Sequence, residues 1–367
     1  MTETICIIAQ RCPEPAYRGD QLAVSKLIKY ANKMGIKIKL VIPFWEKSKV
    51  NKSELLSEND LIECKFLWPN IFVFLTNMLN KRMPLQMRLF SIFRYNIETE
   101  KNIYVHTIRM AIVPRGYLCR QIICPQIDLA VEYRERSEHE KNYIKRYLFQ
   151  KEYKSIIAWQ SENLSKYKFV HCINTDEFEE YEIPRIASFP HGYDVSKTCL
   201  KPFAPSSKLV IGFWGNGSFK PNLNALVKLM KWSDSSNLDH EIRVYGVNWD
   251  FLETRNCSYK GPFNNLAEFL PEVDLLINLV NEGAGFQNKT IEALAWSIPV
   301  IGFPEGFRGL NLPDSLKYLV NSIDEIDATI LSIRADLNGK IFDSVKWIEN
   351  NWDQEKLAIK KIESIIQ

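Results

Sequence analysis

The chain lacks the features that mark several large classes of protein. Only 5 of its 367 residues are histidine, and none of its 8 cysteines forms a Cys-x-x-Cys pair. No His/Cys cluster or Asp-x-Asp triplet predicts a bound metal, and we expect the cysteines to be buried free thiols in a reducing compartment. The net charge of +3 and the pI of about 8.3 are too low to indicate a nucleic-acid-binding protein.

Long hydrophobic runs are also missing. The longest uncharged apolar run, FLWPNIFVFLTNML, has 14 residues and contains Pro69, whereas about 20 residues are needed to span a bilayer. The N-terminus, MTETICIIAQ, has no basic start and only a short apolar part, so it does not resemble a secretory signal. We therefore expect a cytoplasmic protein.

The length and the composition, 46% hydrophobic, predict a globular protein of two domains. The first half opens with an apolar strand at 4–10, followed by helical spacing over 21–35 and an alternating strand at 36–44. This β-α-β order predicts a parallel sheet. Residues 132–168 have helical periodicity and dense charge.

The second half repeats this alternation of strands and helices, which predicts a second doubly wound α/β domain. A stretch with three prolines and little periodicity separates the halves and predicts a linker. The predicted division is a first domain at 1–190, a linker at 191–207, a second domain at 208–345, and a C-terminal helix at 346–367, whose return to the first domain is a further expectation.

Three glycine-bearing loops follow strands of the second domain, where ligands of parallel sheets bind. In the first, FWGNGSFKPN (213–222), Gly215 and Gly217 remove side chains and Pro221 suits the first turn of a helix. Such a loop presents free N–H groups to a phosphate, although an ordinary tight turn fits this loop equally well. The third loop has Gly306 and Gly309.

The second loop, NEGAGFQN (281–288), leads into a helix that starts near Lys289. Lys289 and Glu292 are three residues apart and share one face of its first turn. An ammonium group at a helix start is unfavourable unless an anion binds nearby, so Lys289 is a candidate phosphate ligand and Glu292 a candidate ribose ligand. The alternative is a surface ion pair between the two. Together, the three loops suggest a site for a nucleoside diphosphate.

This order of features resembles glycosyltransferase family 4, in the branch with a Gly-x-Gly-x-x-x-Lys-x-x-Glu-Ala motif. The matching residues are Gly283, Gly285, Lys289, Glu292 and Ala293. IGFWGNGSFKPNLNAL is similar to the opening of the family's second domain, and CPEPAYRGDQLAVSKLIKYANKMGIKIKLV to its N-terminal segment. The resemblance spans most of the chain and is weakest at 48–100.

The resemblance implies a GT-B fold, in which two Rossmann-like domains face a cleft, and a glycosyltransferase activity. A sugar would move from a nucleotide-sugar donor to a polysaccharide or lipid-linked oligosaccharide in surface glycan biosynthesis, with no metal and no other cofactor. Ala284 stands where many members have a first carboxylate, and Glu282 is the nearest replacement. The predicted donor-binding residues lie in the three loops: Gly215, Asn216, Gly217, Lys220, Gly283, Gly285, Phe286, Lys289, Glu292 and Gly306.

The first domain would bind the acceptor. The candidate catalytic residues are His106, at the end of a strand where the family often has a histidine, together with Asp20 and Glu282. The candidate acceptor-binding residues are Gly19, Asp20, Arg109 and Asp128. Three of these residues have a plainer alternative, since Asp20 could cap a helix, His106 could be structural and Arg109 could lie on the surface.

Residues 77–94 combine four basic residues with Met, Leu and Phe, which is typical of peripheral contact with an anionic membrane but also fits an excursion packed on the first domain. Two alternative functions stay open, a nucleotide-sugar epimerase and a non-catalytic nucleotide-sugar or glycan-binding protein. A nicotinamide oxidoreductase is disfavoured, because no Gly-x-Gly-x-x-Gly follows the first strand.

Overall fold

The structure is a computed structural model, and it divides the chain into two compact units. Unit 1 is Met1–Gly192 with Gln354–Gln367, and unit 2 is Tyr193–Asp353. Most of the expected linker, 195–207, lies outside the described residues. The structure describes residues 3–16, 19–57, 59–72, 75, 83–194, 208–249, 256–282, 287–335 and 340–367.

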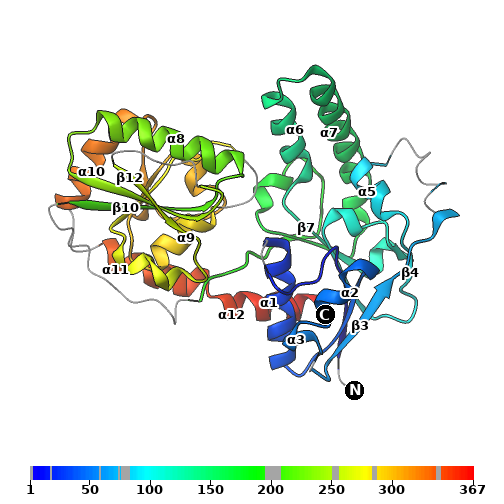
Figure 1. Cartoon of the computed structure of the whole chain (residues 1–367). Helices are drawn as coiled ribbons and strands as arrows, with labels where there is room; N and C mark the ends of the chain where they lie inside the picture. The colour runs from blue at the N-terminus through cyan, green and yellow to red at the C-terminus, as the bar shows by residue number, and fades with distance from the viewer. Residues whose placement is uncertain are drawn as a thin grey trace. The chain divides into compact units, whose positions relative to one another are not determined.

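Unit 1 is built on a seven-stranded sheet in the order β3-β2-β1-β5-β7-β8-β9, with every pair of neighbours parallel (Figure 1). The inner strands β1 and β5 are almost wholly buried, as expected of apolar runs covered on both faces. The strands are β1 Thr4–Ile8, β2 Lys37–Pro43, β3 Ile62–Leu67, β5 Asn102–His106, β7 Gln121–Gln126, β8 Phe169–Cys172 and β9 Ile186–Ser188.

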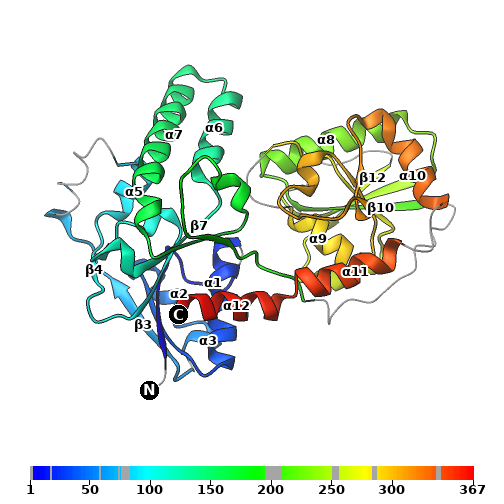
Figure 2. The same cartoon turned by 180° about the vertical axis from the view of Figure 1, so that it is seen from behind.

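The C-terminal helix α12 (Gln354–Ile366) belongs to unit 1, which confirms the expected return. It lies alongside α1 (Gly19–Lys33) in both views (Figures 1 and 2). Ile362 and Ile365 are fully buried and join Leu27 and Ile28 of α1 in one apolar cluster. A separate helix, α11 (Lys340–Asn351), precedes α12 and belongs to unit 2.

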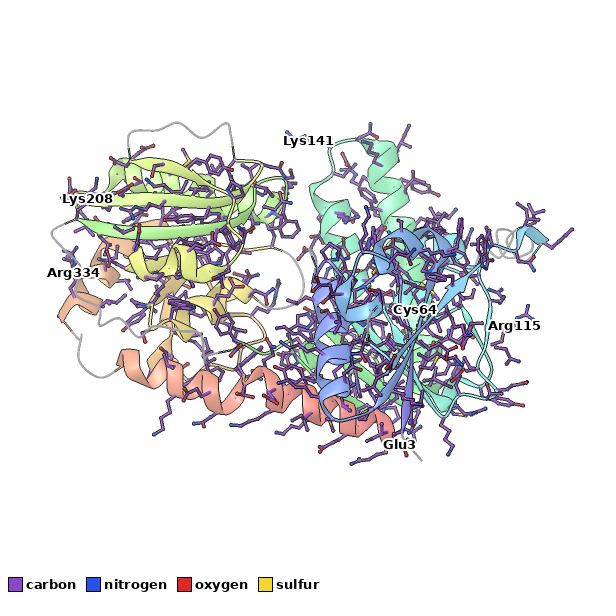
Figure 3. All side chains as sticks on the ribbon, turned by 60° about the horizontal axis from the view of Figure 1, so that its bottom comes forward. Glu3, Cys64, Arg115, Lys141, Lys208 and Arg334 are labelled. Carbon is purple, nitrogen blue, oxygen red and sulfur yellow. The ribbon has the colours of Figure 1, made fainter. Side chains whose placement is uncertain are left out.

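The charged stretch after β7 forms two helices, α6 (Leu129–His139) and α7 (Tyr143–Asn163), which lie side by side as a hairpin. Lys141 lies at the tip of the hairpin, and side chains surround the sheet of each unit (Figure 3). A short helix, α5 (Leu85–Phe90), precedes β5 in the chain.

Unit 2 has a six-stranded sheet in the order β12-β11-β10-β13-β14-β15, again parallel throughout. Its strands are β10 Leu209–Asn216, β11 His240–Val247, β12 Cys257–Gly261, β13 Leu275–Asn278, β14 Val300–Gly302 and β15 Tyr318–Leu319. Among its helices are α8 (Lys220–Ser235), α9 (Asn288–Ala295) and α10 (Ile326–Ala335) (Figure 2).

Both units are doubly wound, as predicted, and in each the strand order reverses beside its first strand. The reversal falls between β1 and β5 in unit 1 and between β10 and β13 in unit 2. In open parallel sheets, ligands bind at the carboxyl ends of the strands at this reversal, so the loops after these four strands are the places to examine. Within the described residues, no helix has the length and apolarity that a membrane span needs.

Candidate functional site

In unit 2, the side chain of Lys289 reaches from the start of α9 to the loop after β10. Its Nζ donates a hydrogen bond to Oδ1 of Asn222, in the first turn of α8, and lies 5.1 Å from the centre of the Phe213 ring. Among the described residues, no carboxylate lies within ion-pair distance of this amine. Burial lowers the pKa of Lys289 to about 8, with Glu292 acting in the opposite direction.

Glycines at the ends of the paired strands β10 and β11, and just after β10, let the two segments approach closely through their backbones. A Cβ on Gly246 would lie 1.9 Å from the Gly215 carbonyl oxygen, and one on Gly217 would lie 2.1 Å from the carbonyl oxygen of Asn248. A Cβ on Gly215 would also lie 2.8 Å from the Asn222 amide and 3.4 Å from Cε of Lys289. The lysine therefore lies directly against the backbone of this loop.

The third loop is tied to the start of α9 by a buried polar network. Asn278, at the end of β13, donates to Oγ1 of Thr290 at 3.1 Å and to the carbonyl of Gly306 at 3.2 Å. The Thr290 hydroxyl donates to the same carbonyl at 2.6 Å. Both polar side chains are fully buried, so the network fixes the position of α9 relative to β13 and β14.

The two carboxylates of this region have different surroundings. Glu292 accepts a hydrogen bond from the indole Nε1 of Trp214 at 2.6 Å, and Glu282 accepts one from Nδ2 of Asn224 on α8. Lys220 is exposed at the start of α8. Gly283, Gly285 and Phe286 lie outside the described residues, so the structure places the lysine of the motif but not its glycines.

This arrangement suits a bound anion. No side chain caps α8, and Asn216 Oδ1 accepts from the N–H of Ser218 just before it. Pro221 has no N–H, and the N–H of Asn222 donates to the Phe219 carbonyl at 3.0 Å, so it is the positive end of the helix dipole that favours a phosphate there. The Lys289 amine, held by Asn222 from the same first turn, adds a cation at that end.

In unit 1, His106 and Asp20 are in contact. The Nε2–H of His106 donates to the backbone carbonyl of Asp20 at 3.0 Å, and the ring is only 2% exposed. The Asp20 carboxylate forms an ion pair of 2.5 Å with Arg11. His106 therefore holds the start of α1, and Asp20 faces the loop after β1.

The remaining predicted acceptor residues separate into different environments. Asp128 is buried and caps α6, with further hydrogen bonds from Gln160 and Tyr181, and burial raises its pKa. Arg109 lines a pocket of about 610 Å³, as does Asp20. Gly19 has open space, since a Cβ there would meet only the His191 ring, 4.0 Å away.

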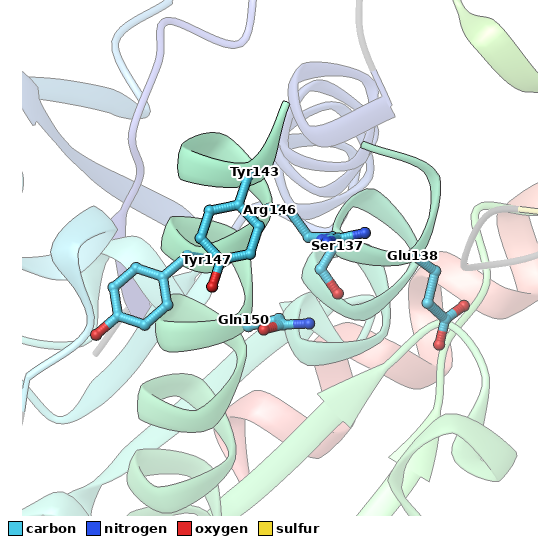
Figure 4. Close-up of a pocket in the computed structure, with 6 residues that line it drawn as sticks. All are labelled: Ser137, Glu138, Tyr143, Arg146, Tyr147 and Gln150. Atoms are coloured by element: carbon cyan, nitrogen blue, oxygen red, sulfur yellow. The ribbon is translucent and has the colours of Figure 1, made fainter. Parts of the chain in front are cut away.

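Another pocket, of about 300 Å³, lies between α6 and α7 near the tip of the hairpin (Figure 4). Tyr143, Arg146 and Tyr147 line it and are all exposed. It contains none of the predicted site residues.

Sequence reasoning missed two groups of residues. Asn222 belongs to the Pro-Asn pair after the glycine loop, and its polar side chain on the first helical turn was a usable signal. The second group is Thr107, which follows β5, and Gln126, which ends β7. Both line the larger pocket, and their φ angles are positive, at 73° and 69°. No local pattern signals such a backbone conformation at a threonine or glutamine.

No protein-family model matches the chain, and no curated protein matches it in sequence. Solved structures do. Anabaena HepE in complex with UDP-glucose has a TM-score of 0.62 at 11% identity, covering 99% of both chains. A glycosyltransferase from Rickettsia africae ESF-5 has a TM-score of 0.63 at 13% identity, covering 99% of this chain and 98% of that one.

WaaG, a glycosyltransferase involved in lipopolysaccharide biosynthesis, has a TM-score of 0.61 at 11% identity, covering 99% of both chains. The chain has the GT-B fold. This confirms the predicted fold class, because the likeness extends over both Rossmann-like units.

Proposed function

We propose that the protein is a glycosyltransferase that moves a sugar from a nucleotide-sugar donor to a polysaccharide or lipid-linked oligosaccharide acceptor. Unit 2 binds the donor and unit 1 binds the acceptor. The proposal includes membership of the family 4 branch suggested by the Lys-x-x-Glu-Ala motif at Lys289, Glu292 and Ala293.

The position of Lys289 is the observation on which the proposal depends. Its amine meets the uncapped start of α8 and the backbone of the Gly215 loop, at the reversal of strand order. A diphosphate in this place gains an ammonium group and the positive end of the α8 dipole, which stabilise its increasing charge as the sugar leaves. The site is preorganised because Asn222 holds the amine and the Asn278 network holds α9.

The other predicted residues take roles around this anchor. Glu292 lies three residues along α9 and is proposed to contact the ribose, and Glu282 is the described carboxylate nearest the loop 283–286, which we assign to the donor sugar. In unit 1, Asp20 and Arg109 are assigned to the acceptor, and His106 positions the backbone of Asp20. HepE with UDP-glucose and the glycosyltransferase WaaG support the reaction class.

Thermal melting with a panel of nucleoside diphosphates tests the proposal. A ligand at 100 times its Kd stabilises the native state by about 2.7 kcal/mol, so one nucleotide should raise the melting temperature by several degrees. Lys289→Ala should abolish the shift, whereas Lys231→Ala, an exposed lysine on α8, should retain it. The donor-site assignment fails if no nucleotide raises the melting temperature or if Lys289→Ala responds like the parent.

Activity separates the enzyme from a binding protein. Incubation with the matching nucleotide sugar should release free nucleotide slowly by hydrolysis and faster with an acceptor. An epimerase would instead alter the sugar without needing an acceptor. A binding protein would release no nucleotide. Chromatography of the nucleotide and of the sugar product distinguishes the transferase, the epimerase and the binding protein.

We also propose that unit 1 touches a membrane surface through exposed apolar side chains before and within α5. Phe72 is 79% exposed, Trp68 67%, Leu85 51% and Leu89 58%. Of the basic residues predicted for this contact, Lys81 and Arg82 lie outside the described residues, and Arg88 and Arg94 donate to backbone carbonyls. The apolar side chains are therefore the main support.

Sedimentation with anionic lipid vesicles tests this contact. The double change Leu85→Ser with Leu89→Ser should lower the bound fraction severalfold, since each leucine contributes about 1.5–3 kcal/mol when fully buried. Leu331→Ser, at a residue of unit 2 that is 53% exposed, is the matched control. Equal binding by all variants would reject the contact.

A further inference from the structure

The larger pocket of unit 1 lies at the reversal of strand order in its sheet. Gln10 and Arg11 follow β1, Thr107 and Arg109 follow β5, and Gln126 ends β7. Its volume of about 610 Å³ is in the range of small-molecule sites. Its position and its lining together define the chemistry of the ligand.

Arg109 is the unbalanced charge of this pocket. Its Nε donates to Oε1 of Gln86, and no carboxylate in the described part of the chain lies within ion-pair distance of the guanidinium. The other charges cancel, because Arg11 pairs with Asp20 and Arg136 pairs with Glu132. Burial lowers the pKa of Arg109, and the nearby carboxylates of Glu132 and Asp20 offset this only in part.

Three residues that line the same pocket each carry a polar group without a partner. Oε1 of Gln10, Oγ1 of Thr107 and Nε2 of Gln126 are buried and have no hydrogen-bond partner among the described residues. Unpaired buried polar groups are uncommon in native proteins and costly. Thr107, only 5% exposed, also has a backbone conformation, φ 73° and ψ 144°, that side chains rarely adopt.

Aromatic and aliphatic side chains complete the lining. Trp45 is 49% exposed and Leu89 is 58% exposed, and both line the pocket with Phe90. An exposed indole offers a flat apolar face, on which the C–H groups of a sugar ring can pack, beside polar groups that can bind its hydroxyls.

We propose that this pocket binds an acceptor sugar bearing a negatively charged group, a phosphate or a carboxylate, which pairs with Arg109. The sugar hydroxyls bind Thr107, Gln126 and Gln10, and the ring packs on Trp45. This inference rests on the proposed function, because it takes the bound sugar to be the acceptor of that reaction. It adds the chemical class of that acceptor. Phosphate and carboxylate share the geometry that a guanidinium fork binds in a bidentate manner.

Direct binding to the full chain tests the proposal. Saturation-transfer NMR compares three probes with the same ring: a hexose 6-phosphate, the hexuronate, and the neutral methyl hexoside. A saturating amount of the nucleoside diphosphate that gives the largest melting shift is added, so that a phosphate probe does not report on unit 2. We expect an anionic probe to bind about tenfold more tightly than the neutral one, and the phosphate and uronate arms identify which anion it is.

Three variants assign the effect to the pocket. Arg109→Gln should remove the preference for the anionic probe and leave the neutral probe unchanged, and Arg109→Lys should restore part of it. Thr107→Val should weaken all probes alike. Arg146→Gln, which changes an arginine of the other pocket, should behave like the parent.

The proposal is overturned if the three probes bind equally, or if a preference for the anion survives Arg109→Gln. A failure of the proposed function looks different. In that case no nucleoside diphosphate binds and no transfer occurs, while the response of the sugar probes to Arg109→Gln is unaffected.

Discussion

The two sheets end in loops of opposite construction. In unit 2, the last residues of β10 and β11 and the residues just after them approach through the backbones of Gly215, Gly217 and Gly246, where a Cβ would overlap a neighbouring group. In unit 1, the groups after β1, β5 and β7 are side chains, those of Gln10, Thr107, Arg109 and Gln126. A backbone-built surface suits a diphosphate common to many donors, whereas a side-chain-built pocket can be selective for one ligand.

The backbone conformations show the same contrast. Beside the reversal of strand order, positive φ angles occur at Gly215 (141°), Gly246 (122°) and Asn248 (64°) in unit 2, but at Thr107 (73°) and Gln126 (69°) in unit 1. Glycine adopts such angles without strain, whereas a β-branched residue does not. Unit 1 therefore places a β-branched threonine in a conformation that unit 2 gives to glycine and asparagine at its reversal, and strain of this kind gathers at binding sites.

The largest effect should come from adding a methyl group to a touching glycine. Gly246→Ala places Cβ 1.9 Å from the Gly215 carbonyl oxygen, at a φ of 122°. We expect a loss of about 2–4 kcal/mol in the free energy of unfolding of unit 2. Urea unfolding followed by tryptophan fluorescence measures it.

The matched control is Gly19→Ala in unit 1, where a Cβ would meet only the His191 ring at 4.0 Å. Because Gly19 is the first residue of α1, alanine should change stability by no more than about 1 kcal/mol. If Gly246→Ala and Gly19→Ala lower the free energy of unfolding by the same amount, close backbone packing does not distinguish the two units.

The next effect is the pH dependence of nucleotide binding. Burial lowers the pKa of Lys289 to about 8, so the amine loses its proton as the pH rises through 8, while a diphosphate keeps its charge. Affinity for the nucleotide should fall about fivefold between pH 8 and pH 9, because only the ammonium form attracts the anion. Isothermal titration calorimetry at several pH values measures the slope.

Stability should change in the opposite direction over this range. The unfolded chain, with an ordinary lysine pKa of 10.5, binds the proton more tightly than the folded chain between pH 8 and about 10.5, so the contribution of Lys289 to stability rises with pH there. Lys289→Gln should remove most of the pH dependence of both nucleotide affinity and stability over this range. Lys289→Arg should do the same while keeping the positive charge. A nucleotide affinity that is constant from pH 7 to pH 9 would contradict the assigned role.

Much of the fold followed from the sequence because its signals are local. The alternation of apolar strands and helical spacing predicts two doubly wound units, and the structure confirms them. Lys289 was expected near a helix start, and it is the second residue of α9. The position of Asn222 on a first helical turn is visible in the sequence, but its contact with Lys289 is not, because it joins segments 67 positions apart.

The unit 1 pocket shows where sequence patterns stop being informative. Gln10, Thr107 and Gln126 meet only because the sheet places β1, β5 and β7 side by side. A positive φ at a threonine after a strand cannot be predicted from the local sequence, because the tertiary structure imposes this conformation. The roles of Gly283, Gly285 and Phe286 stay predictions from the motif.

The smallest effect concerns the strain at Thr107 and tests the comparison most directly. Relief of such a conformation is worth about 1–3 kcal/mol, and glycine costs about 0.5–1 kcal/mol in chain entropy. Thr107→Gly should therefore stabilise unit 1 by roughly 1 kcal/mol, whereas Thr107→Ala, which retains Cβ, should not. Both remove the hydroxyl and should weaken sugar binding, so Thr107→Gly gains stability as it loses affinity. Urea unfolding and the sugar probes measure the two quantities, and a Thr107→Gly variant less stable than Thr107→Ala would show that this backbone is not strained.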